Sequence, residues 1–219
     1  MKKRPDLLAG EELPAAPQQR RSLEKRTKLK AAGLALFGQK GYERTSIEEI
    51  ARRAKLAVGG FYLYFDSKRQ LLLTLMDELL EKLSRLDLQP GNETSSSVQE
   101  GLRSLLWRAF SHDLRYLGAY RAWQEAVLSE PGLAEKQEAI QVWTTARVVS
   151  LFETLQQLPG ARVDVDVPGL ARVMDSFFWS LLGQAALLPK IKLNQSIDSA
   201  THLIYHALFA DSNVEPRRP

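Results

Sequence analysis

The chain has 219 residues, of which 44% are hydrophobic, and a formal net charge of +4. This length is enough to bury a sizeable core in one large domain or two smaller ones. There is no cysteine, which excludes a disulfide framework, a thiolate metal site and a cysteine nucleophile. No apolar run reaches the roughly 18 to 20 residues of a membrane span, and no signal-peptide core follows the charged N-terminus. We therefore expect a soluble, cytoplasmic protein.

Positive charge is concentrated in one segment. Residues 20–69 hold 13 Lys and Arg against 5 Asp and Glu, whereas residues 70–219 hold 14 against 18. A local positive excess is what attraction to nucleic-acid phosphates requires, although a solvated helix face is the ordinary alternative. This segment is therefore the candidate nucleic-acid interface.

Residues 1–21 contain Pro5, Pro14 and Pro17 and show no sustained hydrophobic period. We expect a disordered arm here. Its basic side chains could reach the minor groove of DNA, as the arms of some DNA-binding proteins do, or the arm could be a tail without function.

A helix is predicted over residues 22–39, because apolar positions recur at helical spacing and Gly41 follows as a stop. The apolar positions are Leu29, Ala32, Leu36 and Phe37. Four cations near its start could touch a DNA backbone or could simply favour solubility: Lys25, Arg26, Lys28 and Lys30.

The stretch from Thr45 to Lys68 predicts two short helices that meet at a tight corner. Ser46 can cap the first helix, and Glu49 three positions later completes a capping box. The helix then buries Ile47, Ile50, Ala51 and Ala54 on one face. The hydrophobic period breaks in the sequence KLAVGG, where we expect a turn, and it resumes in FYLYF.

The second short helix has two different sides. Phe61 and Phe65 share one side, whereas Gly59 and Leu63 share the other. Two consecutive glycines, Gly59 and Gly60, leave no side-chain bulk, so the backbone can approach a phosphate or a base edge closely. The glycine side is therefore predicted to read DNA.

Residues 23–80 resemble the DNA-binding domain of the tetracycline-repressor (TetR) family of bacterial transcription regulators. The resemblance lies in motifs that occur in the family's order: Phe37, Gly41-Tyr42, Thr45-Ser46, Gly59, Tyr62-Leu63-Tyr64-Phe65 and Ser67-Lys68. Two positions depart from the family pattern. Ala57 stands where a capping Ser or Thr is common, and Gly60 stands where a side chain usually lies.

The resemblance implies a set of DNA contacts. Phosphate contacts that fix the register would come from Thr45, Tyr62, Tyr64 and Lys68, with Ser46 beside them, although core packing competes for Tyr64. Base reading would fall to Val58, Gly59, Gly60 and Leu63, with Arg44 and Lys55 as helpers. Because the four base-reading residues include no Arg, Asn or Gln for a bidentate contact, thymine methyls and DNA shape are expected to carry much of the specificity.

The remaining chain is helical in pattern. Ser67 can cap a connecting helix that runs to Leu86, and a Pro, Gly and Ser loop over 87–97 follows it. Further helices are predicted over 98–113, 115–129, 132–158, 167–188 and 195–210. The expected organisation is all-α, with a DNA-binding domain at 22–68, an effector-binding and dimerisation domain at 69–211, and a disordered tail at 212–219.

The family resemblance also implies an effector pocket and a dimer interface in the second domain. Pocket candidates are Trp107, Phe110, Trp123, Trp143, Arg147, Phe177 and Trp179, with Asp175 as a further polar contact and plain core packing as the alternative. They would suit a mostly apolar small molecule. The last two helices are apolar on more than one face, which favours a four-helix dimer interface that includes Phe178, Leu182, Ile197, Ile204 and Leu208.

Enzymatic interpretations find little support. His202 and His206 have the i, i+4 spacing of a metal pair but lack the glutamate of a zinc protease, and Asp164 and Asp166 fit a solvated loop. No catalytic residues, metal or cofactor are expected. We predict a homodimeric repressor that binds a palindromic operator in double-stranded DNA and is released by a small effector. The alternatives are an effectorless DNA-binding protein, or a helical enzyme or adaptor with a vestigial helix-turn-helix.

Overall fold

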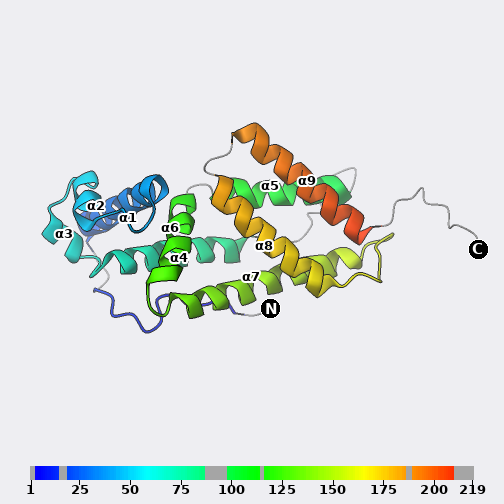
Figure 1. Ribbon diagram of the computed structural model, residues 1–219, viewed down its shortest axis with the longest axis horizontal. Coiled ribbons are helices and arrows are strands. Elements are labelled where there is room, and N and C mark those ends of the chain that lie inside the picture. Colours follow the sequence, from blue (N-terminus) through cyan, green and yellow to red (C-terminus); the bar gives the residue numbers. More distant parts are fainter. Residues whose placement is uncertain (1–2, 15–18, 87–97, 114–115, 186–188, 210–219) are drawn as a thin grey trace, which may run out of the picture. The chain divides into compact units, whose positions relative to one another are not determined.

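The structure is a computed structural model that describes residues 3–14, 19–86, 98–113, 116–185 and 189–209 (Figure 1). Its helices are α1 (Arg20–Lys40), α2 (Ile47–Arg53), α3 (Val58–Tyr62), α4 (Lys68–Arg85), α5 (Val98–Asp113), α6 (Leu117–Ser129), α7 (Leu133–Gln156), α8 (Val167–Ala185) and α9 (Lys190–Leu208). In the described residues the only β-pairing is an isolated bridge between Ala161 and Phe209. The predicted all-α fold is confirmed. None of the described helices is long and apolar enough to cross a membrane.

The chain divides into two compact units. The first unit holds residues 4–85 and 113–140, and the second unit holds the rest. The sequence predicts a domain boundary after residue 68, with the next helix shared as a connector; in the structure that helix, α4, lies in the same unit as the short helices, together with α6 and the start of α7. The reason is packing, because α1 lies against α2, α4 and α6. The predicted linker at 87–97 and the tail at 212–219 lie outside the described residues.

The first unit has a continuous apolar core built from the faces that the helical periods predict. Leu29 and Phe37 of α1, Ile50 of α2 and Phe61 of α3 are all fully buried. Gly41 ends α1 with φ of 81° and donates its amide to the Phe37 carbonyl oxygen at 2.9 Å. The short helices therefore pack against α1 through a shared apolar core.

Helices α1 and α6 approach each other at two glycines. A Cβ atom on Gly118 would overlap the carbonyl oxygen of Leu34 and lie 2.9 Å from the Gly38 nitrogen. A Cβ on Gly38 would lie 3.2 Å from the Gly118 Cα. The position of α6 against α1 therefore depends on the absence of side chains at this crossing.

The N-terminal residues contradict the prediction of a disordered arm over 1–21. Leu7 is only 1% exposed, and its amide donates to a carboxylate oxygen of Asp77 at 3.2 Å. Arg4 pairs with Asp77 at 2.5 Å and with Glu81 at 3.2 Å, both on α4. The prediction failed because a single buried leucine and separate ion pairs leave no hydrophobic period in the sequence.

A second set of contacts continues this N-terminal segment, residues 4–14. Glu11 pairs with Arg69 of α4 at 2.5 Å and with Lys136 of α7 at 3.8 Å. The side-chain amide nitrogen of Gln70 donates to the Glu12 carbonyl oxygen at 2.6 Å, and the side-chain oxygen of Gln70 accepts the backbone amide of Asp66 at 2.8 Å. The segment is therefore tied to the junction between the short helices and α4. Residues 15–18 lie outside the described residues.

The second unit contains a buried polar cluster between α7 and α8. Asp175 is 6% exposed and accepts hydrogen bonds from the hydroxyls of Thr144 and Thr145 at 2.9 and 2.8 Å. Burial raises the pKa of Asp175, and the hydrogen bonds from Thr145, Thr144 and Trp179 partly oppose this shift.

Helix α9 begins earlier than predicted, at Lys190 instead of residue 195. Pro189 occupies its N-cap, and Leu193 of the first turn is 4% exposed. Two lysines and the exposed Ile191 interrupt the apolar pattern of this turn, so the period alone did not reveal it.

Candidate nucleic-acid interface

The start of α2 confirms the predicted capping box. The Ser46 hydroxyl accepts the Glu49 amide at 3.2 Å, and the Glu49 carboxylate accepts the Ser46 amide at 3.3 Å. The Lys40 ammonium is the main cause that lowers the pKa of Glu49, and the Ser46 amide adds to it. Ser46 therefore fixes where α2 begins, and its hydroxyl is already engaged inside the protein.

The corner between α2 and α3 turns at a lysine in a left-handed conformation. Lys55 has φ of 59°, which non-glycine residues adopt uncommonly. The Lys55 amide donates to the Arg52 carbonyl oxygen at 3.1 Å and the Leu56 amide to that of Ala51 at 2.9 Å. These bonds close α2 and set the direction in which α3 leaves.

Helix α3 presents an exposed apolar end. Val58, Tyr62 and Leu63 are 38%, 49% and 68% exposed. On the other side Phe61 and Phe65 are fully buried, with ring centroids 5.7 Å apart. The predicted division into an exposed side and a core side is confirmed, but α3 starts at Val58, so the glycines lie inside the helix and not in the turn before it.

The fold itself does not require glycine at positions 59 and 60. A Cβ on Gly59 would meet no atom within 4 Å, and a Cβ on Gly60 would meet only the Leu56 Cβ at 3.6 Å, an ordinary contact. Neither residue has a positive φ. Glycine in a helix costs about 0.8 to 1.0 kcal/mol relative to alanine, so this small surface lowers the stability of α3 without relieving any clash in the protein.

Two predicted phosphate contacts are buried. Thr45 is 2% exposed, and its hydroxyl donates to the Gly41 carbonyl oxygen at 2.7 Å. Tyr64 is 8% exposed and belongs to the core. The sequence places both residues next to exposed ones, and only the packing shows that they face the core. Core packing is thus the observed role of Tyr64, and contact of either residue with DNA stays a prediction.

The other predicted contacts remain accessible to different degrees. Arg44 and Tyr62 are exposed, and Lys68 is half-buried. The Lys68 ammonium donates to the Tyr42 carbonyl oxygen at 2.8 Å and lies 4.1 Å from the centroid of the Tyr42 ring. Lys68 is thereby held in place beside the end of α3.

Sequence reasoning missed the residues that hold this corner from α6. The Tyr42 amide donates to Glu125 at 2.6 Å, and the Ser129 hydroxyl donates to Glu43 at 2.7 Å. These partners are more than 80 residues apart. No local pattern in the sequence indicates partners at this separation.

The candidates for an effector pocket do not all lie in one unit. Trp123 belongs to the first unit, where it is fully buried and its indole donates to the side-chain oxygen of Gln137 at 2.6 Å. Trp143 and Arg147 are buried in the second unit, with the guanidinium 5.3 Å from the Trp143 ring centroid. Burial lowers the pKa of Arg147.

The remaining pocket candidates differ in exposure. Trp107 is 41% exposed, and Phe177 and Trp179 are half-buried. The Trp179 indole donates to the Thr144 hydroxyl at 3.3 Å, beside Asp175. The side chain of Phe110 lies outside the described residues.

Four of the five predicted dimer contacts are buried within the protomer. Leu182 is 7% exposed, and the three residues of α9 are 0 to 1% exposed: Ile197, Ile204 and Leu208. Leu182 of α8 and the apolar stripe of α9 pack in the protomer's own core, and a role for these residues in a dimer interface stays a prediction. Only Phe178 of this set is half-buried.

A capped helix, a tight corner and a short second helix with an exposed end, all on a basic support, define a helix-turn-helix DNA-binding protein. Residues 29–75 match the family model described as bacterial regulatory proteins, tetR family.

Two curated relatives extend this match. The chain is 30% identical over 146 residues to the HTH-type transcriptional repressor KstR of Rhodococcus jostii (strain RHA1). The aligned region covers 66% of this chain and 69% of that protein. The chain is 44% identical over 59 residues to the uncharacterized HTH-type transcriptional regulator YuxN of Bacillus subtilis (strain 168), covering 27% of this chain and 20% of that protein. The chain belongs to the tetR family of bacterial transcription regulators, which are not enzymes.

A solved structure agrees with this assignment at the level of the fold. The SmeT–triclosan complex matches with a TM-score of 0.65 and 21% identity, over 89% of this chain and 96% of that chain.

Proposed function

We propose that this regulator is a homodimeric repressor that binds a palindromic operator and is released by a small, mostly apolar effector. The observation that carries the proposal is the bare outer side of α3, where exposed Val58 and Leu63 flank two glycines that the fold does not require. A side of this kind suits close contact with the floor of the major groove, thymine methyls included.

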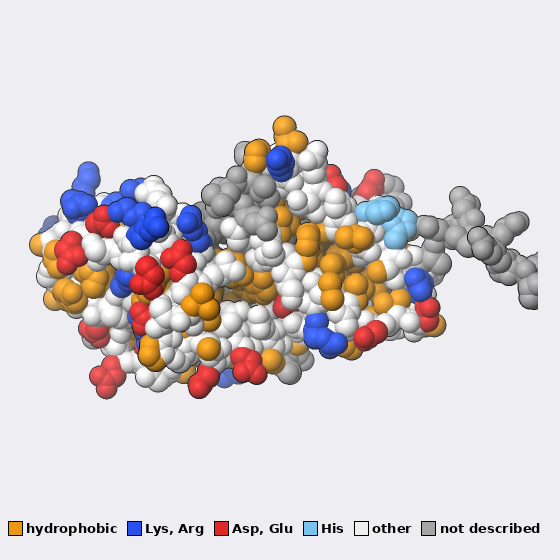
Figure 2. Space-filling view, viewed as in Figure 1, with side chains coloured by type: hydrophobic (Ala, Val, Ile, Leu, Met, Phe, Trp, Pro, Cys, Tyr) orange, Lys and Arg blue, Asp and Glu red, His pale blue; other side chains and the backbone are white. Residues whose placement is uncertain are grey.

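The second unit offers a surface for a second copy of the chain. Hydrophobic side chains gather over α8 and α9 in Figure 2. Val173 of α8 and Leu203 of α9 are 63% and 58% exposed. Their exposure supports them as interface residues, whereas four of the five residues that the sequence predicts there are buried. A two-fold dimer carries two reading helices, so its operator would contain two half-sites related by symmetry.

The effector is proposed to bind in the second unit. Trp143, Phe177 and Trp179 supply aromatic surface, and Asp175 with its threonine partners supplies a few directed polar groups. Pockets for small molecules commonly combine these two features. The structurally similar protein SmeT forms a complex with the small molecule triclosan. This supports a small-molecule effector for the present chain.

Binding to labelled DNA from the chain's own upstream region, with unrelated duplex as competitor, tests the reading function. We expect sequence-specific binding by the parent protein and its loss in Tyr62→Ala, with the helical circular dichroism unchanged. Leu128→Ala, at an α6 residue that is 89% exposed, is the matched control and should bind normally. Absence of specific binding by the parent with any fragment of that region would contradict the proposal.

The effector is tested on the same complex. Native mass spectrometry of the purified protein should show a copurified small molecule, or one member of a panel of apolar compounds, beginning with triclosan, should dissociate the DNA complex. If neither is observed while specific binding persists, the effectorless alternative is the better description.

A further inference from the structure

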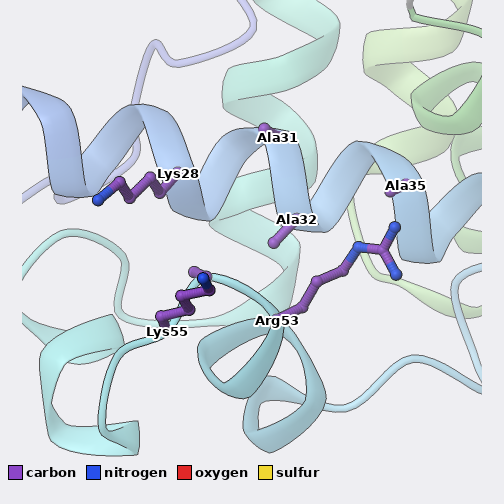
Figure 3. Close-up of a pocket in the computed structure, with 7 residues that line it drawn as sticks. Lys28, Ala31, Ala32, Ala35, Arg53 and Lys55 are labelled. Atoms are coloured by element: carbon purple, nitrogen blue, oxygen red, sulfur yellow. The ribbon is translucent and has the colours of Figure 1, made fainter.

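A shallow groove runs between α1 and the end of α2. Its volume is about 450 Å³. One wall is the face of α1 formed by Lys28, Ala31, Ala32 and Ala35, and the other wall is formed by Arg53, Ala54 and Lys55. Figure 3 shows the side chains of Arg53 and Lys55 extending from the α2 end toward α1. We call this feature the cationic groove.

The charges of the cationic groove are uncompensated. Lys28, Arg53 and Lys55 are all exposed, no acidic residue lines the groove, and none of the three has an ion pair within the described chain. Neighbouring cations differ, because Lys30 pairs with Glu78, and Lys40 with Glu49. Three cations around an alanine floor attract an anion strongly and offer no pattern of donors and acceptors that would select a particular organic group.

The position of the groove indicates which anion it takes. Lys55 lies in the corner only three residues before Val58, the first residue of α3. The two sugar–phosphate backbones border the major groove on both sides, so a duplex that accepts α3 brings phosphates beside this corner. A phosphate needs positive charge and little else, which is what the cationic groove provides.

We propose that Lys28, Arg53 and Lys55 together hold one backbone phosphate of the operator, next to the bases that α3 reads. This inference rests on the proposed DNA-binding function. It also changes the role predicted for Lys55, from helping to read bases to fixing the register of the protein on the duplex.

The test compares the triple variant Lys28→Gln, Arg53→Gln, Lys55→Gln with the parent by fluorescence anisotropy on operator and on unrelated duplex, between low and high salt. Loss of one phosphate contact should reduce the slope of log affinity against log salt by about 0.9 and weaken binding about tenfold near 0.1 M salt. The loss should be similar on both duplexes, since phosphates carry no sequence information. The triple variant Arg162→Gln, Arg172→Gln, Lys192→Gln, at three exposed cations of the second unit, removes the same number of positive charges and is the control.

A scan of single methylphosphonate substitutions in the operator locates the contact. At one position the neutral linkage should weaken binding of the parent but have no further effect on the triple variant. A full effect in both proteins at every position, or an unchanged salt slope, would overturn the proposal while the parent's specific binding still upheld the proposed function. Absence of specific binding by the parent would instead be a failure of the proposed function.

Inorganic phosphate distinguishes DNA from a soluble phosphorylated molecule as the source of the anion. Chemical shifts of the Ala32 and Lys55 amides are followed during a phosphate titration at constant ionic strength. Saturation below about 1 mM, together with an unchanged salt slope for DNA, would assign the groove to a soluble anion and overturn our assignment.

Discussion

The phenol of Tyr42 donates a hydrogen bond of 2.6 Å to the carboxylate of Glu130, just beyond the end of α6. Tyr42 lies two residues beyond the end of α1 and is 2% exposed. Burial is the main cause that raises the pKa of Tyr42, and the Glu130 carboxylate raises it further. Together with the bond from the Tyr42 amide to Glu125, this contact fastens α6 to the loop that leads into α2.

Tyr42→Phe should lower the free energy of unfolding by about 1 to 2 kcal/mol, because a hydrogen bond to a charged acceptor is lost. Urea denaturation at pH 7 measures the change. Tyr62→Phe, at a side chain that is 49% exposed, is the matched control and should leave stability unchanged. Equal stability of parent and Tyr42→Phe would contradict the contribution we assign to this bond.

The same pair of proteins should differ in alkaline solution. The pKa of Tyr42 is higher in the folded than in the unfolded protein, so its contribution to stability is complete below about pH 10 and decreases as the pH rises above that value. The stability advantage of the parent over Tyr42→Phe should therefore shrink above pH 10. A constant difference from pH 8 to pH 11.5 would show that Tyr42 ionises normally in the folded state.

Gly59→Ala and Gly60→Ala should each raise the free energy of unfolding by about 0.5 to 1 kcal/mol, since alanine favours helix and the new Cβ meets no obstacle. Affinity for the operator should fall at least about tenfold, because the methyl group lies between α3 and the bases. Thermal melts and DNA titrations of the same samples measure both effects. Unchanged affinity in both variants would show that the bare side of α3 is not in contact with DNA.

Gly118→Ala should have the opposite effect on stability. Its Cβ would overlap the Leu34 carbonyl oxygen at the crossing of α1 and α6, so a loss of about 1 to 3 kcal/mol is expected from forced separation of the helices. Gly60→Ala serves as the matched control with the same change in chemistry. A Gly118→Ala protein as stable as the parent would mean that α6 can move away from α1 without cost.

Leu7→Ala should destabilise the protein by about 2 to 4 kcal/mol, the usual cost of removing a fully buried leucine side chain. Leu13→Ala, in the same segment but 40% exposed, should cost well under half as much. Urea denaturation separates the two. If both variants were as stable as the parent, the N-terminal segment would be the disordered arm that the sequence predicts.

Asp175→Asn should change how stability depends on pH. Because the pKa of Asp175 is raised in the folded protein, its contribution is favourable below about pH 3.9 and is lost as the pH rises through the folded pKa. The variant should therefore gain stability relative to the parent between pH 4 and pH 7.

Asp164 is the control, because its pKa is shifted in the opposite direction from that of Asp175. Arg162 lowers the pKa of Asp164, so Asp164→Asn should show no gain over the same pH range. If the stabilities of the parent and Asp175→Asn depended on pH in the same way, burial would not raise the pKa of Asp175.

The sequence was sufficient wherever the signal is local. The capping box of Ser46 and Glu49, the helix end at Gly41 and the opposite sides of α3 depend on residues within four positions of one another, and hydrogen bonding and side-chain spacing over that range determine them. The order of these motifs was also enough to predict the family.

Only the tertiary structure decided the direction of residues with two plausible environments. Thr45 and Tyr64 face the core, Ile204 packs within its own protomer, and Leu7 is buried beside α4. The partners of Tyr42 lie more than 80 residues away. Contacts at that separation depend on how whole helices pack, and a period of 3.6 residues describes one helix without saying which neighbour covers it.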